Sequence, residues 1–340
     1  MRPTHTDIAR EAGVSPATVD RVLNNRSGVR RRTREVVLGT ARRLGYVSDG
    51  SVPVQQVPGQ RMRLDFVLPM GANPFIKMLH QQLDQQAAAR SELDVHFHII
   101  EGFNPDTLAR ALQGLRGQTQ GVGLIALDHP TVREAIRTLS AAGVKIVTLA
   151  SDILHVPRIA YVGIDNRQAG RLAGHLVGRF LGTTELRKVA LFAGSLSYRG
   201  HEEREMGFRH ILAESFCNLQ IVELREVRDD SDKAYVEASA LLERYGDLAA
   251  VYNVGAGNGG IARALKERNR AGSIVFMAHE ATEENKALLL DGTIDALIDQ
   301  NPRVEARETL NILSRSIQGQ PYEYHGPRVQ IIFKENIPEF

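Results

Sequence analysis

The sequence predicts an α/β protein, with a small all-helical head followed by two doubly wound parallel α/β lobes. Three observations support this prediction. Arginine is concentrated in the first 47 residues, where caps and apolar spacing are helical. From residue 64 onward, short apolar runs alternate with helix-length patterns, as in repeated strand, crossover, strand units. The length of 340 residues also exceeds what one hydrophobic core comfortably holds.

Composition narrows the class of protein. Hydrophobic residues make up 43% of the chain and charged residues 24%, which excludes a disordered or collagen-like protein. No apolar run approaches the roughly 18 residues of a membrane helix, and the charged start lacks the apolar core of a signal peptide. We therefore expect a cytoplasmic protein with no membrane partner. A lone cysteine, Cys217, and histidines without ligand spacing give no reason to expect a metal or a redox site.

The formal charge of +2 conceals an uneven distribution. The first 47 residues hold ten arginines against four carboxylates, a formal charge of +6, and the rest of the chain has a charge of −4. A compact basic segment has the electrostatic character of a surface that meets polyphosphate, although such a run is often only a solvated face.

Caps and apolar spacing predict three short helices in this basic head. Thr6 is a candidate N-cap of the first helix, and Gly13 is its left-handed stop. Ser15 is a candidate N-cap of the second, with Pro16 at the first helical position, and Thr33 opens the third. We expect the inner faces to form one small core, made of Ile8, Ala9, Val14, Val19, Val22, Val37, Leu44 and Tyr46.

The spacing of Ala9, Gly13 and Val19 is typical of a helix-turn-helix, with a small residue at the helix contact, a turn and an apolar plug. The second helix can then enter a major groove, where Arg21 can donate to a guanine edge or to phosphate. The residues that we expect at the DNA are Thr4, His5, Thr6, Ser15, Pro16, Ala17, Thr18, Asp20, Arg21, Asn24, Asn25 and Arg30.

The segment from Asp7 to Asn24, followed by Thr33-Arg34 and Leu44-Gly45-Tyr46, resembles the DNA-binding head of the LacI/GalR family of bacterial transcription regulators. This resemblance implies a homodimer whose paired heads bind a two-fold symmetric operator. Asp20 departs from the family, which usually has Ser before its arginine, so base preference stays open.

A second departure follows the head. Family members commonly continue with a hinge helix that wedges a leucine into the minor groove, whereas two prolines and two glycines interrupt this chain. We therefore predict a DNA-binding domain over residues 1–47 and a linker over residues 48–63.

The body contains eleven candidate strands separated mostly by helix-length intervals. They are Leu64 to Leu68, Val95 to Ile100, Gly123 to Leu127, Lys145 to Leu149, Ala160 to Ile164, Lys188 to Phe192, Ile221 to Glu226, Ala249 to Asn253, Ser273 to Ala278, Ala296 to Ile298 and Val329 to Phe333. This pattern predicts parallel sheets covered by helices.

Polar residues follow several of these strands, and open α/β sheets bind ligands at the carboxyl ends of their strands. The body resembles the type I periplasmic sugar-binding proteins, as LacI/GalR regulators generally do. The resemblance implies a small polar effector, most simply a carbohydrate, held by Asn73, Phe75, Asp152, Arg204, Asn253, Glu280 and Gln300. Sugar receptors often have Asp-Arg at the positions of Ala150 and Ser151, so two alternatives stay open for Asp152: it substitutes from two residues later, or it does not contact the ligand.

The same resemblance implies two lobes joined by a crossover at Gly163-Ile164-Asp165-Asn166. We predict an N-terminal lobe of residues 64–166 and 301–322 and a C-terminal lobe of residues 167–300 and 323–340.

Simpler interpretations stay open for the body. The asparagines can be helix caps, Phe75 can be a core residue, and Arg204 and Glu280 can be exposed surface charges. Gly255-Ala256-Gly257-Asn258-Gly259-Gly260 satisfies the dinucleotide pattern G-x-G-x-x-G after a strand, so a nicotinamide-dependent oxidoreductase is the leading alternative. A cytoplasmic solute-binding module with an accessory basic head is another. We predict a DNA-binding regulator, a repressor, that is not an enzyme and needs no cofactor.

Overall fold

The computed structural model describes residues 4–23, 29–44, 46, 61–71 and 73–338. The chain divides into two compact units, a head formed by residues up to 57 and a body that holds nearly all residues from 58 onward. Of the predicted linker, residues 48–60 lie outside the described residues, as do Asn24 and Asn25. In the described part of the chain, no helix is long and apolar enough to cross a membrane.

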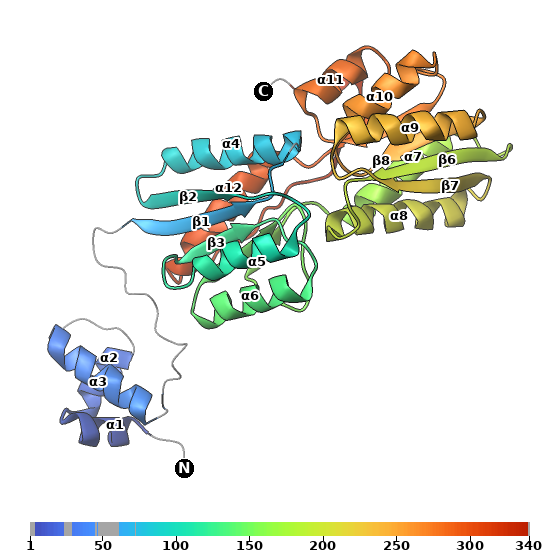
Figure 1. Ribbon diagram of the computed structural model, residues 1–340. Coiled ribbons are helices and arrows are strands. Elements are labelled where there is room, and N and C mark those ends of the chain that lie inside the picture. Colours follow the sequence, from blue (N-terminus) through green and yellow to red (C-terminus); the bar gives the residue numbers. More distant parts are fainter. Residues whose placement is uncertain (1–3, 24–28, 45, 47–60, 72, 339–340) are drawn as a thin grey trace. The chain divides into compact units, whose positions relative to one another are not determined.

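The head consists of the three predicted helices, α1 (His5–Ala12), α2 (Pro16–Leu23) and α3 (Arg31–Arg43) (Figure 1). Their buried core is made of Ile8, Ala9, Val19, Val22, Val37 and Ala41. Val14 and Leu44 pack against it and are partly buried. The prediction that Tyr46 is a core residue is wrong, because Tyr46 is 40% exposed and its ring lies at the edge, 5.3 Å from that of His5.

Two helix starts differ from the prediction. Thr4, not Thr6, caps α1, because Thr4 and Asp7 form a reciprocal capping box. The third helix begins at Arg31, two residues before Thr33. Ser15 caps α2 as predicted, and its Oγ accepts a hydrogen bond from the backbone N–H of Thr18 at 3.2 Å. Gly13 ends α1 in the left-handed conformation, with φ of 66°.

The body begins with a five-stranded parallel sheet, in the order β2-β1-β3-β4-β5. Its strands are β1 (Met62–Leu68), β2 (Leu93–Ile99), β3 (Gly121–Leu124), β4 (Lys145–Leu149) and β5 (Ala160–Val162). The helices of this part are α4 (Pro74–Ala88), α5 (Pro105–Gly114), α6 (Pro130–Ala141) and α12 (Pro302–Ile317). Nearly all residues of the inner strands β1 and β3 are buried, because helices cover both faces of the sheet, whereas the edge strand β2 is mostly half-buried or exposed.

A six-stranded sheet follows, in the order β11-β10-β9-β8-β6-β7. Its strands are β6 (Arg187–Ala193), β7 (Leu219–Glu226), β8 (Leu248–Asn253), β9 (Val275–His279), β10 (Ala296–Asp299) and β11 (Gln330–Ile332). The helices are α7 (Asn166–Leu181), α8 (Arg199–Ser215), α9 (Ser231–Arg244), α10 (Asn258–Glu267), α11 (Glu283–Leu290) and the 3-10 turn η1 (Lys334–Asn336).

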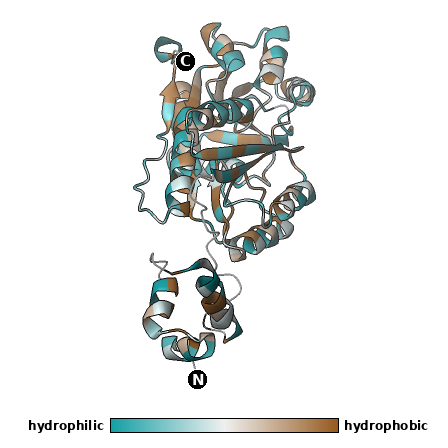
Figure 2. Ribbon diagram, turned by 90° about the vertical axis from the view of Figure 1, so that its left-hand side faces the viewer, coloured by the Kyte–Doolittle hydropathy of each residue, from teal (hydrophilic) through white to brown (hydrophobic). Residues whose placement is uncertain are grey.

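Each predicted strand overlaps an observed one, but the sheets are not wholly parallel. The edge strand β11 runs antiparallel to β10, with Ile298 opposite Ile331. A long connection after α12 brings the chain to the sheet edge from the opposite end, so no parallel crossover forms. Figure 2 shows that the helices of both units carry hydrophobic and hydrophilic residues, as amphipathic helices do.

The chain crosses between the two sheets more than once. After β10 of the second sheet, α12 packs against α4 and β4 of the first lobe (Figure 1). The chain then returns to pair β11 with β10. Several segments of the chain therefore connect the two sheets.

Candidate functional sites

The outward face of α2 is the candidate nucleic-acid interface of the head. Val19 and Val22 point into the core, whereas Pro16, Ala17 and Arg21 are exposed. Ser15 is exposed as well, and Thr18 and Asp20 are half-buried. An exposed helix face of this size suits the major groove, which is about 12 Å wide.

Arg21 differs from other arginines of the head. Arg10 pairs with Asp7 at 2.9 Å, and Arg43 pairs with Glu11 at 2.8 Å. Within the described residues, no ion pair or hydrogen bond holds the Arg21 side chain. Its donors are therefore free to bind a base edge or a phosphate.

The remaining predicted DNA-binding residues of the head differ in their exposure and in whether their side chains already form hydrogen bonds. The Thr4 hydroxyl takes part in the capping box, and His5 is half-buried beside Tyr46. Thr6 and Arg30 are exposed. Thr4 therefore has a structural role in starting α1, whatever it contacts in a complex.

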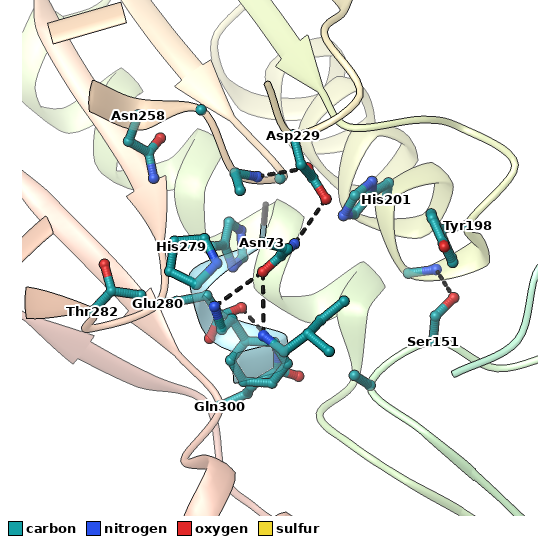
Figure 3. Close-up of a pocket in the computed structure, with 18 of the residues that line it drawn as sticks. Asn73, Ser151, Tyr198, His201, Asp229, Asn258, His279, Glu280, Thr282 and Gln300 are labelled. Atoms are coloured by element: carbon teal, nitrogen blue, oxygen red, sulfur yellow. Dashed lines mark hydrogen bonds between the residues drawn. The ribbon is translucent and has the colours of Figure 1, made fainter. Parts of the chain in front are cut away.

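A pocket between the two lobes is the candidate ligand site of the body. It is partly open to solvent, and side chains from both lobes line it. Figure 3 shows side chains from several strand ends around it. The lining consists of Asn73, Pro74, Phe75, Ile76, Ile125, Ala150, Ser151, Tyr198, Gly200, His201, Arg204, Asp229, Gly255, Ala256, Gly257, Asn258, His279, Glu280, Thr282, Glu284, Asn285 and Gln300.

Five of the seven predicted ligand residues lie in this lining, namely Asn73, Phe75, Arg204, Glu280 and Gln300. Asn73 is also a helix cap, since its Oδ1 accepts hydrogen bonds from the N–H groups of Phe75 and Ile76 at 3.0 and 3.3 Å. Asn73 therefore both caps α4 and lines the pocket.

The structure does not bring the other two predicted residues to the pocket. The Asp152 carboxylate accepts hydrogen bonds from Thr148 Oγ1, at 2.7 Å, and from Arg158. These partners explain why it does not replace the missing Asp-Arg pair.

Asn253, the second such residue, is fully buried. Its side-chain Nδ2 donates to Ala256 O at 3.0 Å and to Asn258 Oδ1 at 2.7 Å, and its Oδ1 accepts from Gly255 N–H at 3.2 Å. Asn253 therefore shapes the glycine-rich loop that lines the pocket.

Arg204 is held firmly in the pocket wall and is 4% exposed. Its Nε donates to Asn166 Oδ1 at 2.8 Å, and one Nη donates to the Val254 carbonyl at 2.9 Å. The other Nη lies 3.5 Å from Glu280 Oε1. Gly170 of α7 lets α8 approach closely at Arg204, since a Cβ added at Gly170 would overlap the Arg204 carbonyl. This close approach positions Arg204.

His279, Glu280 and Gln300 form one wall of the pocket, at the ends of β9 and β10 (Figure 3). Gln300 Nε2 donates to Glu280 Oε1 at 2.7 Å, and His279 Nε2 lies 2.7 Å from the Tyr252 hydroxyl. Burial raises the pKa of the Glu280 carboxyl to about 8. Burial also lowers the pKa of His279 well below its usual value, so its imidazole is neutral.

Hydrogen bonds connect the lobes across the pocket. Asn73 Nδ2 donates to Asp229 Oδ2 at 2.8 Å, and Asp229 Oδ1 accepts from Ala256 N–H at 2.9 Å (Figure 3). Ser151 Oγ accepts from Gly200 N–H at 3.2 Å. The lobes are therefore in contact in this structure.

Asp229, His201, Ser151 and Tyr198 line the pocket but were not among the predicted ligand residues. Asp229 follows β7, so the rule that ligands bind at strand carboxyl ends was a signal that would have found it. Tyr198 belongs to the loop after β6 and packs against Phe103 of the other lobe, with 5.4 Å between ring centres. That packing has no local sequence signal.

The G-x-G-x-x-G segment opens α10, but packing explains its glycines. Gly257 has φ of 94°, a conformation that favours glycine. A Cβ at Gly260 would overlap the carbonyl of Ser231, where α10 meets α9. The pattern thus arises from a turn and a close helix contact, without any need for a dinucleotide.

The helix-turn-helix head and the two-lobed body with its pocket together define a DNA-binding class of protein that carries a binding-protein fold. Residues 4–49 match the family model for bacterial regulatory proteins of the lacI family, and residues 64–321 match the model for the periplasmic binding protein domain. The chain belongs to the family of periplasmic binding protein domains through its body and carries the lacI-family domain at its head.

Similar proteins agree with this assignment. The HTH-type transcriptional regulator DegA of Bacillus subtilis is 26% identical over 249 residues, which cover 72% of this chain and 71% of DegA. The sucrose operon repressor of Escherichia coli is 35% identical over 135 residues, which cover only 38% of this chain and 40% of that protein. Both are named as regulators, and the chain is a DNA-binding transcriptional regulator of this kind.

A solved structure shows the same fold as the body. GanP, a glucose-galactose binding protein from Geobacillus stearothermophilus, matches with a TM-score of 0.75 at 21% identity. The match covers 82% of this chain and all of GanP. The predicted periplasmic-binding-protein architecture is therefore confirmed.

Proposed function

We propose that the chain is a homodimeric repressor that acts in the cytoplasm, where its operator DNA lies. Each head places α2 in a major groove, and the two heads of a dimer bind half-sites that are roughly 34–36 Å apart. Arg21 carries this proposal, because it is exposed on the outer face of α2 and has no partner among the described residues.

The pocket holds a small carbohydrate effector between an N-terminal lobe of residues 64–166 and 301–322 and a C-terminal lobe of residues 167–300 and 323–340. Phe75 lines the pocket but is 6% exposed and belongs to the hydrophobic core of the first lobe. The amide and carboxyl groups of the lining, which suit sugar hydroxyls, therefore carry this part of the proposal. The similarity to GanP, a glucose-galactose binding protein, and to the sucrose operon repressor supports a sugar as well.

Effector binding controls the operator through the angle between the lobes. Because the pocket walls come from both lobes, a ligand favours the lobe arrangement that completes its contacts. To change the ratio of the two lobe arrangements from 1:99 to 99:1, the effector must bind one arrangement more favourably than the other by about 5.5 kcal/mol. The lobe angle in turn sets the spacing of the two heads.

The DNA claim can be tested with an operator selected from a random duplex library. We expect a two-fold symmetric selected sequence and an affinity that falls steeply with added salt, because bound phosphates release counterions. Arg21→Ala should abolish sequence preference in fluorescence anisotropy. Arg10→Ala is the matched control, since it removes the same charge from an arginine already paired with Asp7. Equal losses for the two variants would contradict groove recognition by α2.

The effector claim can be tested by thermal shift with sugars, polyols and nicotinamide dinucleotides. A sugar should raise Tm, because a ligand that binds only the folded state stabilises it. Adding that sugar should also change operator affinity. Stabilisation by dinucleotides alone would favour the oxidoreductase alternative.

A further inference from the structure

The chain between β6 and the first turn of α8 contacts the first lobe, although it belongs to the second. This stretch is the 197–200 segment. At its start, the Ser197 carbonyl accepts a hydrogen bond from the Asp128 N–H of the first lobe at 3.1 Å. At its end, the Gly200 N–H donates to Ser151 Oγ of the first lobe at 3.2 Å (Figure 3). Both ends of the segment are therefore bonded to the opposite lobe.

Tyr198, inside this segment, is buried among residues of the first lobe. Its side chain is 6% exposed and belongs to the hydrophobic core cluster built on the five-stranded sheet. In the described part of the chain, no other buried member of that cluster comes from the second sheet or its helices. The Tyr198 ring meets the Phe103 ring edge-on, with 5.4 Å between the ring centres and 75° between the planes. Because burial removes a large aromatic surface from water, this contact favours the arrangement in which the lobes touch.

The loop that receives Tyr198 is held in an unusual backbone conformation. Phe103 has φ of 64°, a left-handed conformation that costs a non-glycine residue free energy. Directly after it, Asn104 Oδ1 caps α5 by accepting hydrogen bonds from the N–H groups of Asp106 and Thr107 at 3.1 and 3.2 Å. A strained residue persists only where surrounding contacts fix it. The cap on one side and the Tyr198 ring on the other supply these contacts.

The hydroxyl and the backbone of the segment also reach the first lobe. A Cβ added at Gly102 would lie 3.7 Å from the Tyr198 hydroxyl, and one added at Gly200 would lie 3.2 Å from the Ala150 carbonyl oxygen. Burial raises the pKa of the Tyr198 hydroxyl, and a backbone hydrogen bond at Phe103 opposes this shift. The contact therefore involves a neutral hydroxyl, an aromatic ring and a closely approaching backbone.

These contacts form without the help of a ligand. Separation of the lobes would expose the Tyr198 ring, leave a cavity in the core of the first lobe and break the hydrogen bonds of Asp128 and Gly200. Water can replace the hydrogen bonds, but it does not fill an apolar cavity favourably. The ring therefore holds the lobes together more strongly than the two hydrogen bonds do.

We propose that Tyr198 is a latch that holds the two lobes together in the free chain, before any ligand binds. An effector then acts on an equilibrium that already favours contact between the lobes, and the strength of the latch sets how far a ligand can shift it. This inference goes beyond the proposed function, because it concerns the free chain and holds for any ligand of the pocket.

Hydrogen exchange of single amides measures this equilibrium. The Asp128 N–H and the Gly200 N–H are bonded across the lobes, so their protection reports separation of the lobes. The Ile100 N–H, which bonds to the Leu68 carbonyl at 3.0 Å within the first lobe, is the internal reference. The full chain is studied without DNA and is refolded from urea, so that it carries no ligand. We expect the Asp128 N–H to exchange at least about tenfold more slowly than in the unfolded chain.

Substitutions of two tyrosines separate the latch from a general effect on packing. Tyr198→Ala should lower the protection of the Asp128 N–H at least about tenfold, because it removes a large buried side chain. The protection of Ile100 should stay within about twofold. Tyr198→Phe keeps the ring and should stay within about fivefold of wild type at Asp128. Tyr235→Ala is the matched control and should leave Asp128 unchanged, because Tyr235 is half-buried on α9 and its hydroxyl donates to Glu267 at 2.6 Å inside the second lobe.

Phe103→Gly removes the partner ring and leaves the 197–200 segment intact, so it tests the contact even if Tyr198→Ala does not fold. It should also lower the protection of Asp128. The double variant Phe103→Gly/Tyr198→Ala should lose less than the product of the two single losses, because both changes remove one contact.

Three results would overturn the latch. They are an Asp128 N–H that exchanges in wild type as fast as in the unfolded chain, equal Asp128 protection in wild type and in the single variants at Tyr198 and Phe103, and a loss at Ile100 as large as that at Asp128. Each of these results leaves groove recognition by α2 and the carbohydrate effector to their own tests.

Discussion

Asn73 offers a sharp test of how effector binding is coupled to the lobes. Its Oδ1 caps α4, while its Nδ2 donates to Asp229 Oδ2 across the pocket at 2.8 Å. Asn73→Asp keeps the acceptor that caps the helix, because aspartate is an equally good N-cap. The same change removes the donor and sets two carboxylates against each other.

The size of the effect follows from this contact. A hydrogen bond to a charged group contributes about 1.5–3 kcal/mol, and Asp229 is only 7% exposed, so water replaces little of it. Each 1.4 kcal/mol is about a factor of ten in an equilibrium constant. We therefore expect Asn73→Asp to disfavour the contacting lobe arrangement by roughly 10- to 100-fold and to weaken effector binding by a similar factor.

Calorimetric titration with the most strongly stabilising neutral sugar measures this loss, and small-angle X-ray scattering of the unliganded chain measures lobe opening. The double variant Asn73→Asp/Asp229→Asn restores one donor and one acceptor with the direction of the bond reversed. It should recover most of the affinity. Affinity within twofold of wild type for the single variant, or no recovery in the double variant, would refute the coupling through this bond.

Two further predictions concern stability. Gly170→Ala should lower the free energy of unfolding by about 1–3 kcal/mol in urea, because the added methyl overlaps the Arg204 carbonyl; Gly114→Ala, which meets no atom within 4 Å, is the control and should not destabilise the body. The pKa of Glu280 is raised to about 8, so the folded state binds this proton more tightly than the unfolded state does. The stability that this group contributes is therefore present at low pH and declines as pH rises from about 4.5 to 8. Urea unfolding from pH 5 to 9 should show a shallower decline in Glu280→Gln than in wild type, and identical slopes would contradict the burial of a protonated carboxyl.

Local pattern was sufficient for much of this fold. Turn and cap chemistry at Gly13 and Ser15 predicted the helix-turn-helix, because these residues act within one helical turn of their own position. The strands were equally clear, since buried parallel strands are continuous apolar runs. The direction of β11 was not predictable in this way, because it depends on the path of the connection after α12.

The ligand site was predictable in part. Two of the predicted residues, Asn73 and Phe75, come after β1, and Gln300 comes directly after β10. The parallel topology brings the carboxyl ends of such strands together. Asp152 illustrates the limit of this argument, because Thr148 and Arg158 engage its carboxylate before any ligand can. Whether a side chain is available to bind a ligand depends on its hydrogen-bond partners in the folded protein, and these cannot be predicted from a single sequence.

The order of residues along the chain thus established a basic helical head and two largely parallel α/β lobes, since each rests on periodicity, capping and charge within short segments. The class of regulator followed from the resemblance of the head and the body to a known family. The folded arrangement established the pairing of Asn73 with Asp229 and the wall of His279, Glu280 and Gln300, in which one buried polar atom of each residue has no partner among the described residues. Those features join residues from different lobes or from separate strands, and their chemistry arises from burial and from neighbours that only packing brings within hydrogen-bonding distance.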